Sequence, residues 1–209
     1  MVNHYLYYNG PVIEHTSPTI PQKSFWGEIL ELVRFALLAA IIVIPIRVFI
    51  AQPFIVSGSS MVPTFENRDY LIVDELSYRL EEPSRGDVVI FRYPNDTSKY
   101  FIKRMIGLPG ETIRVEGDTV TIKNDAFPGG FVLEEPYIKN HMTGTQTVER
   151  TLKPDEYFVM GDNRPASSDS RFWGPVPKED LVGRAFLRLY PLKELDIFPG
   201  EHHVYESTQ

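Results

Sequence analysis

The sequence has no cysteine and only five histidines among its 209 residues. Without cysteine the chain can form no disulfide bond, use no thiol nucleophile and build no zinc site from thiolates. Four histidines lie in terminal segments, so a Ser-His-Asp triad would depend on His141, which lies in a polar loop. The pair His202–His203 has no acidic or histidine partner at a ligand spacing, which is typical of a solvated tail. We therefore expect neither a metal nor an organic cofactor.

Positive charge is also scarce. Lysine and arginine number 21 against 28 aspartates and glutamates, which gives a net charge of −7. An acidic chain is a poor partner for phosphate backbones, so we expect no nucleic-acid ligand. Hydrophobic residues make up 43% and charged residues 23%, and the length suffices for one medium domain with a sizeable core. These values predict an ordered globular domain.

Long apolar runs are absent except near the N-terminus. As a helix, residues 30–50 would extend ~31 Å, close to the ~30 Å of a bilayer core. The uninterrupted apolar run, 35–46, is shorter, and Arg34 and Arg47 would have to lie at the interfaces. We predict a transmembrane signal-anchor helix over 26–52, with a buried helix of a soluble protein as the alternative. Flanking positive charges are balanced and give no orientation.

After this segment the pattern changes to short runs rich in β-branched and aromatic residues, punctuated by proline and glycine. Such runs predict strands, and Gly117-Asp118 between two of them predicts a hairpin turn. Short helical turns are expected at 74–81 and 177–182, loops over 127–153 and a polar tail over 193–209. The predicted strands are Tyr70–Val73, Asp87–Phe91, Tyr100–Ile106, Thr112–Val115, Thr119–Lys123, Glu156–Met160 and Ala185–Tyr190.

Two segments carry candidate chemistry. The turn VSGSSMVPTF (residues 56–65) contains Ser57, Ser59 and Ser60. A serine attacks a carbonyl only when a base takes its proton, and with histidine scarce the best base is Lys103 in YFIKRMIGLPGE. Strand alternation places this lysine between two apolar side chains of one face. The alternative is a water-facing lysine on an edge strand.

A lysine base must be neutral, and this requirement predicts burial. Lowering a lysine pKa by about 3 units costs ~4 kcal/mol. Desolvation against Phe101 and Met105 is expected to supply it. A carboxylate in contact would favour the ammonium form instead. We therefore expect that neither Asp87 nor Asp162 contacts the amine of Lys103.

Four blocks, in order, resemble those of bacterial type I signal peptidases, and the resemblance covers about residues 26–192. A serine box alone would be weak, whereas four ordered blocks behind an apolar segment are specific. The blocks are Ser57-Gly58-Ser59-Ser60-Met61 with Pro63-Thr64, Arg85-Gly86-Asp87-Val88-Val89-Ile90-Phe91, Lys103-Arg104 with Gly107-Leu108-Pro109-Gly110, and Gly161-Asp162-Asn163-Arg164 with Ser167-Ser168-Asp169-Ser170-Arg171.

The resemblance implies roles for residues at the matching positions. It implies Ser60 as nucleophile, Lys103 as general base, Ser167 orienting Lys103, the backbone N–H of Ser60 with Ser57 at the oxyanion, Met61 in the substrate cleft, and supporting ion pairs Asp162–Arg104 and Asp169–Arg171. Two positions depart from the common pattern. Gly58 replaces a serine that serves the oxyanion in some members, which leaves the second donor open. Pro165-Ala166 replaces the usual Asp-Asn.

The resemblance also implies a fold and a function. It implies a mainly β protein: a cytoplasmic segment (1–25), one transmembrane helix (26–52), an extracytoplasmic barrel-like serine–lysine protease domain (53–192, with a small insertion at about 111–155) and a tail (193–209). The implied activity is removal of signal peptides after Ala-X-Ala sites in the bacterial plasma membrane. The implied partners are preproteins, lipid and the Sec translocon. The alternatives are a specialised peptidase for pilus or conjugation subunits, a self-cleaving repressor, and a catalytically silent binding domain.

Overall fold

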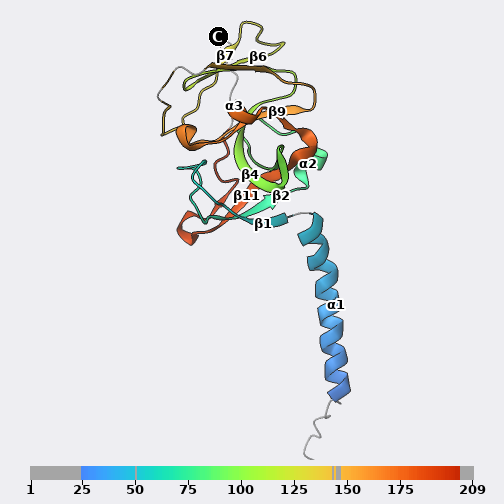
Figure 1. Cartoon of the computed structure of the whole chain (residues 1–209). Helices are drawn as coiled ribbons and strands as arrows, with labels where there is room; N and C mark the ends of the chain where they lie inside the picture. The colour runs from blue at the N-terminus through green and yellow to red at the C-terminus, as the bar shows by residue number, and fades with distance from the viewer. Residues whose placement is uncertain (1–24, 50, 143, 145–146, 203–209) are drawn as a thin grey trace, which may run out of the picture. The chain divides into compact units, whose positions relative to one another are not determined.

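The computed structural model describes residues 25–49, 51–142, 144 and 147–202, in two compact units, 1–42 and 43–209 (Figure 1). The first unit contains most of helix α1 (Phe25–Phe49). A helix is therefore confirmed where one was predicted, but within the described residues no helix is both long and apolar enough to cross a membrane. The predicted segment 1–25 lies almost entirely outside the described residues.

The second unit is mainly β, as predicted. Its larger sheet has eight strands in the order β1-β2-β11-β3-β4-β9-β10, with β12 paired to β11. All its pairings are antiparallel. The strands are β1 (Ala51–Ile55), β2 (Tyr70–Asp74), β3 (Val88–Tyr93), β4 (Asp96–Gly107), β9 (Glu156–Met160), β10 (Val176–Pro177), β11 (Leu181–Tyr190) and β12 (Asp196–Ile197).

The smaller sheet has four strands in the order β7-β6-β5-β8, inserted between β4 and β9. Gly117 and Asp118 form the predicted tight turn between β5 and β6, where Glu116 pairs with Thr119. The φ of Gly117 is 58°, a left-handed value that suits glycine in such a turn. The strands are β5 (Thr112–Glu116), β6 (Thr119–Lys123), β7 (Phe131–Val132) and β8 (Thr147–Thr151).

Three apolar clusters hold the domain together. Strand β3 separates two of them, because its alternate residues face opposite sides: Val88 and Ile90 pack with Met61 and Phe65, whereas Val89 and Phe91 pack with Met105 and Val159. The third cluster joins the small sheet to the ends of β4 and β9. Strand β4 therefore contributes to all three clusters and is rigidly packed along its second half.

All seven predicted strands are present within a few residues of their expected ends. Two other expectations were wrong. Residues 127–153 were predicted to be loops, yet they contain β7 and β8, which are too short or too polar to give a strand pattern. The predicted polar tail contains β12 and a packed segment up to His202, with Pro199 buried. The short helices are α2 (Ser77–Leu80), η1 (Arg164–Ala166), α3 (Ser170–Trp173), η2 (Lys178–Asp180) and η3 (Leu192–Glu194).

Candidate active site

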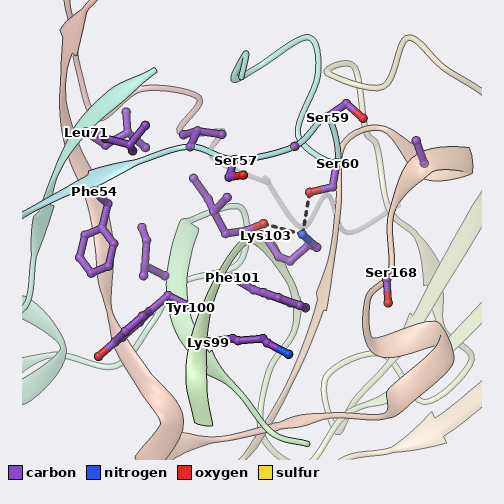
Figure 2. A pocket seen from close by; sticks show the side chains of 16 residues that line it. Phe54, Ser57, Ser59, Ser60, Leu71, Lys99, Tyr100, Phe101, Lys103 and Ser168 are labelled. Atoms are coloured by element: carbon purple, nitrogen blue, oxygen red, sulfur yellow. Dashed lines mark hydrogen bonds between the residues drawn. The ribbon is translucent and has the colours of Figure 1, made fainter. Parts of the chain in front are cut away.

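Ser60 and Lys103 meet beside strand β4 of the large sheet. Ser60 lies in the turn between β1 and β2, which is closed by hydrogen bonds from Val62 N to Ser59 O and from Phe65 N to Met61 O. Lys103 lies in the middle of β4. Its Nζ is 2.7 Å from Ser60 Oγ and 2.8 Å from its neighbour's carbonyl, Ile102 O (Figure 2). The structure therefore brings together the two residues predicted to perform the chemistry.

Burial changes the protonation of Lys103. Its side chain is packed so that the residue is only 4% exposed, and its Nζ lies 5.4 Å from the ring centroid of Phe101. Desolvation lowers the pKa of Lys103 to about 8, although the charges of Asp169 and Asp162 act in the opposite direction. An appreciable fraction of this amine is therefore neutral near neutral pH. The alternative of an edge-strand lysine facing water is excluded by this burial.

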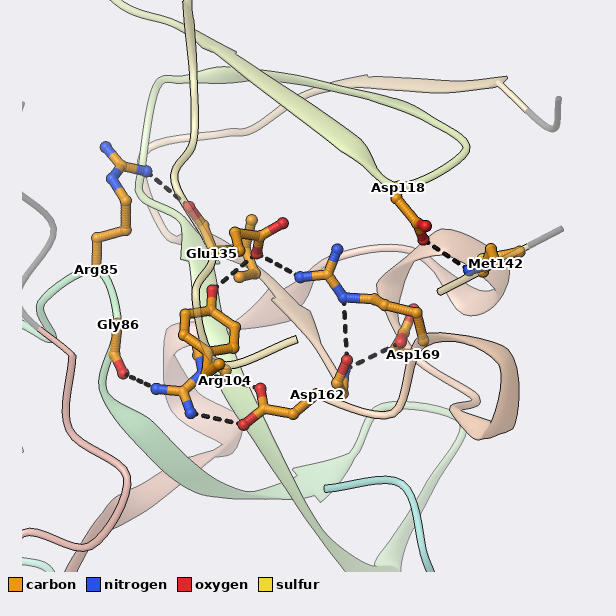
Figure 3. Close-up of polar contacts among 12 residues, drawn as sticks. Arg85, Gly86, Arg104, Asp118, Glu135, Met142, Asp162 and Asp169 are labelled. Atoms are coloured by element: carbon orange, nitrogen blue, oxygen red, sulfur yellow. Dashed lines mark hydrogen bonds and ion pairs between the residues drawn. The ribbon is translucent and has the colours of Figure 1, made fainter. Parts of the chain in front are cut away.

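The two predicted ion pairs are present behind the site. Arg104 binds Asp162 through Nε and Nη2, at 2.8 and 2.6 Å, and Thr64 Oγ1 donates to the same carboxylate (Figure 3). Asp169 accepts from Arg171 Nε and Nη2, both at 2.8 Å. Each carboxylate is thus neutralised by an arginine in bidentate geometry. Asp87 instead accepts from the hydroxyl of Tyr78 and from Ser84 N. We expected that neither Asp87 nor Asp162 contacts the amine of Lys103, and the hydrogen bonds of both carboxylates agree with this.

Sequence reasoning missed the role of Asn163. Its backbone N–H donates to Ser60 O at 3.0 Å and its Nδ2 donates to Ser59 O at 2.9 Å. Its Oδ1 accepts from Asn140 Nδ2 at 3.2 Å. Asn163 thereby joins the turn after β9 to the backbone of the serine turn. An asparagine between Asp162 and Arg164 carries no sequence signal for such a contact.

Gly161 allows these two segments to approach each other. A Cβ at this position would lie 2.4 Å from Ser60 O and 2.3 Å from Ser167 Oγ, distances that real side chains do not tolerate. Its N–H donates to Asp169 Oδ2 at 3.1 Å. Glycine is thus required here by close approach of backbone rather than by an unusual φ.

Ser167 is buried, at 5% exposed, but its contact differs from the prediction. Within the described part of the chain its Oγ has no hydrogen-bond partner, and the amine of Lys103 donates to Ser60 and Ile102 instead. The hydroxyl lies beside Gly161, on the inner side of the turn that leads into α3. A buried unpartnered hydroxyl is costly, so Ser167 is available for an interaction that this arrangement does not contain.

The Ser60–Lys103 pair lines an open cavity of about 660 Å³. Its walls are mainly apolar and include Phe54 of β1 and Tyr100 of β4, whose rings pack edge to face at 5.4 Å. Ser57 lines this cavity, as do Ala166 and Ser168. Its other lining residues are Ile55, Val56, Gly58, Ser59, Leu71, Ile90, Lys99, Phe101 and Ile102.

Met61 was expected in this cleft, but that prediction was wrong. Its side chain is 1% exposed and packs in the core with Phe65 and Leu71. The turn directs Ser60 toward the cavity and the next side chain toward the core. The path of the backbone through this turn decides which side chain faces the cavity and which faces the core, and the sequence does not reveal that path.

His141 does not belong to the site. Its side chain is two-thirds exposed, lies 2.9 Å from Asp118 at the β5–β6 turn, and does not line the cavity that contains Ser60. Ser60 therefore forms no Ser-His-Asp triad with His141. In the part of the chain that the structure describes, no acidic or histidine side chains gather as a metal-binding group.

A buried lysine amine against a serine hydroxyl, at the wall of an open apolar cavity, is the arrangement of a serine hydrolase. Comparisons with known proteins make the class specific. The model of the family described as signal peptidase, peptidase S26, matches residues 29–190. The chain belongs to this family, and it is a serine peptidase of the signal peptidase I type.

The relatives agree with this assignment over most of the chain. A probable signal peptidase I-2 of Synechocystis is 38% identical over 187 residues, covering 87% of this chain and 81% of the relative. A signal peptidase I of Leptolyngbya laminosa is 36% identical, covering 88% and 91%. A crystal structure of a signal peptidase I from Enterococcus faecalis, 32% identical, covers 50% of this chain and 97% of that one with a TM-score of 0.41.

Proposed function

We propose that this serine peptidase removes signal peptides from exported preproteins with Ser60 as nucleophile and Lys103 as general base. The observation that carries the proposal is the 2.7 Å contact between Lys103 Nζ and Ser60 Oγ at the wall of the cavity. Burial supports it, because an amine with a pKa of about 8 is a far better base at neutral pH than an ordinary lysine.

In the first step, neutral Lys103 accepts the hydroxyl proton while Ser60 Oγ attacks the scissile carbonyl carbon. The ammonium then returns the proton to the leaving amine, and the acyl-enzyme remains. Water, deprotonated by the same amine, attacks the ester carbonyl, and the ammonium returns the proton to Ser60 Oγ as the acid product leaves. Apart from water, every group in this scheme belongs to the chain or the substrate.

The developing oxyanion needs donors. The backbone N–H of Ser60 is the first, since it moves with the nucleophile itself. Ser57 lines the same cavity and supplies a hydroxyl, which compensates for Gly58. We assign Ser57 as the second donor. This assignment predicts that Ser57→Ala lowers kcat without changing the pH dependence set by Lys103.

Ser167 is proposed to orient Lys103 once the hydrogen bond between Lys103 Nζ and Ser60 Oγ is lost. In the acyl-enzyme, Ser60 Oγ is esterified and is a poorer acceptor for the N–H groups of the Lys103 amine. The unpartnered Oγ of Ser167 then provides a replacement acceptor. The inner position of Ser167, beside Gly161 and the Ser60 carbonyl, supports this role.

The cavity supports a preference for small side chains before the cut. Phe54, Tyr100 and Phe101 are large and each contacts another aromatic ring, so they limit the room beside an extended chain. We propose that substrates carry Ala-X-Ala before the scissile bond, since alternate residues of an extended chain face one side. The two alanines would face the apolar wall and the middle residue would face away.

We further propose that α1 attaches the chain to the lipid bilayer, with the catalytic domain outside the cytoplasm. Large apolar side chains along this helix, among them Trp26, Phe35 and Ile41, are exposed, and a helix that is apolar all round is suited to lipid. Carbonate extraction of membranes from expressing cells tests the attachment, and added protease tests the side. The Sec translocon is proposed as a partner on functional grounds alone.

The test of the activity uses a purified preprotein with an Ala-X-Ala site, in detergent micelles. Wild type is compared with Ser60→Ala, Lys103→Ala and Ser59→Ala, the last being a matched control one position away. A single cut after the site by wild type and by Ser59→Ala, lost in the other two, supports the proposal. Cleavage that survives in Lys103→Ala contradicts the dyad. No cleavage by folded wild type favours a specialised peptidase or a binding domain.

A further inference from the structure

The segment 196–202, here named the C-terminal strap, is firmly attached to the catalytic domain. Strand β12 pairs with β11, and Phe198 N donates to Phe186 O at 2.7 Å. The rings of the same two residues pack edge to face at 5.3 Å. Arg184 lies over the Phe198 ring at 4.4 Å, and Pro199 is buried. The strap is therefore part of the folded domain up to its last described residue.

Two glycines fit the strap closely against the segments that carry the active site. A Cβ on Gly200 would lie 2.4 Å from Thr64 Cγ2, in the turn that contains Ser60. A Cβ on Gly86 would lie 1.9 Å from His202 O. Both glycines have left-handed φ values, 73° and 96°. The strap thus contacts both the serine turn and the start of β3.

The strap also supplies a ligand to Arg104. The Nη1 of this arginine donates to Gly200 O at 2.6 Å and to Gly86 O at 2.8 Å, whereas Nε and Nη2 bind Asp162. Figure 3 shows the guanidinium between Gly86 and Asp162. Arg104 is fully buried, and it directly follows Lys103 in β4. Its position therefore depends on acceptors from three separate segments, one of which is the strap.

This arrangement matters because the charges of two carboxylates act on Lys103. Asp162 comes from the turn after β9 and Asp169 from the start of α3, and each favours the ammonium form of the lysine. Arg171 neutralises Asp169, and Arg104 together with Thr64 neutralises Asp162. If Arg104 or Thr64 moves away, the negative charge of Asp162 acts on Lys103 with less compensation.

We propose that the C-terminal strap is a positioning element of the active site, which holds Arg104 and Thr64 against Asp162 beside the Ser60–Lys103 pair. The inference rests on the proposed function of Lys103 as the base. It goes beyond that function by giving the strap a task in the reaction. The strap touches no reacting atom and acts only through Arg104, Thr64 and Asp162.

The test compares Gly200→Ala with Gly174→Ala in the full chain, in micelles. Gly174 has a φ of 92°, but nothing lies within 4 Å of an added Cβ there, so this control carries the backbone strain without displacing the strap. The readouts are the pH profile of kcat/KM and an NMR titration of the Lys103 side chain with labelled lysine. The titration needs no turnover, so it remains informative if the proposed function itself fails.

For Gly200→Ala we expect the acid limb of the profile and the Lys103 titration to move to higher pH by about one unit, a roughly tenfold loss at pH 7 that is recovered above pH ~9. Gly174→Ala should keep the wild-type titration. Equal profiles for the two variants, after correction for any common loss of stability, would overturn the proposal.

A rescue variant checks that the shift arises from the contact with the serine turn. Thr64→Ser removes the Cγ2 atom that the new Cβ would meet but keeps the hydroxyl that donates to Asp162. The double variant Gly200→Ala/Thr64→Ser should therefore titrate closer to wild type than Gly200→Ala does, a coupling that a mutant cycle measures. A shift of the same size in the single and double variants would count against the proposed route through Thr64.

Phe198→Ala covers the case in which Gly200→Ala fails to fold. This variant removes the ring that attaches the strap to Phe186 and Arg184, but it adds no atom to the packed interior. We expect the Lys103 titration to move in the same direction, by less than in Gly200→Ala. Ile197→Ala is the control, since that side chain is exposed. A folded Phe198→Ala variant whose Lys103 titrates as in wild type would contradict the proposal.

Discussion

The backbone N–H of Asn163 donates to the carbonyl oxygen of Ser60, at 3.0 Å, although the two residues are far apart in the sequence. The side chain of Asn163 adds a second bond to Ser59 O. The serine turn is thus bound by one residue through two successive carbonyls, which fixes the direction of the Ser60 side chain. For the proposed role of Ser60 as nucleophile, such control of direction toward the buried amine of Lys103 contributes directly to rate.

This relationship predicts the effect of Asn163→Asp. The carboxylate has nearly the shape of the amide but cannot donate to Ser59 O. We expect kcat to fall roughly tenfold, which corresponds to ~1.4 kcal/mol, with little change in KM. Asn140→Ala is the matched control, because it removes the contact of Asn140 with Asn163 Oδ1 but leaves the bond to Ser59. Steady-state kinetics on a preprotein would contradict the prediction if both variants lost the same activity.

The buried amine of Lys103 predicts a specific pH dependence of stability. Its pKa in the folded chain is about 8, against an ordinary 10.5. The unfolded chain therefore binds more protons between these two values, and the free energy of unfolding gains a rising contribution from pH 8 to 10.5. Below pH 8 the full penalty is present, about 3 kcal/mol at 1.36 kcal/mol per unit.

Lys103→Met should remove this penalty and be more stable than wild type at pH 7, by up to about 3 kcal/mol. The lost hydrogen bond to Ser60 reduces the gain. The decisive measurement is the difference in unfolding free energy at pH 7 and at pH 10.5, from urea titrations of both proteins. A difference that does not shrink as pH rises would mean that the amine is not desolvated.

In wild type, kcat/KM should rise about tenfold per pH unit up to pH 8.

Met61 gives a prediction about packing rather than chemistry. Because its side chain is buried among Phe65 and Leu71, Met61→Ala should cost about 2–5 kcal/mol of stability, whereas Met61→Leu should cost under about 1.5. Cleavage-site selection by both variants should be that of wild type at a temperature where they are folded. Mapping the cut by mass spectrometry checks this. If Met61→Leu cleaved at additional sites, the result would indicate that Met61 contacts the substrate and would contradict this prediction.

The sequence predicted the parts of this protein whose signals are local. Five strands of the large sheet, β2, β3, β4, β9 and β11, follow from runs of β-branched and aromatic residues, and the turn at Gly117-Asp118 follows from its composition. The pairing of Ser60 with Lys103 was predictable because a candidate nucleophile and a candidate base are defined by residue type, and because the family resemblance fixes their spacing. The packing of Met61 into the core depends on the path of one turn, which no pattern in VSGSSMVPTF encodes.

Long-range contacts between ordinary residues were not predictable. The strap reads DIFPGEH, so its only signals were the apolar residues Ile197, Phe198 and Pro199 within a segment that otherwise resembles a tail. Its attachment depends on pairing with β11 and on a carbonyl reaching Arg104, and neither has a local signature. By contrast, the helix α1 was predicted correctly from its apolar composition.

Gly161 supplies the last prediction. Its φ is not left-handed, so Gly161→Ala adds no backbone strain and acts only through contacts. The new Cβ would lie 2.3 Å from Ser167 Oγ and 2.4 Å from Ser60 O. The hydroxyl of Ser167 can rotate away or be removed by mutation, but the carbonyl of Ser60 is held by its hydrogen bond from Asn163 N. We therefore expect loss of stability and a decrease in turnover rate by about two orders of magnitude, the size of effect that a misplacement of about 1 Å causes.

The double variant Gly161→Ala/Ser167→Gly separates the two contacts. Removing the Ser167 side chain relieves the clash with Oγ and Cβ, so stability measured by thermal unfolding should be largely restored. The contact with Ser60 O remains, so the serine turn stays displaced and activity should stay low, below that of Ser167→Gly alone. Recovery to the activity of Ser167→Gly would show that the close approach of Gly161 to the Ser60 carbonyl is not what positions the nucleophile.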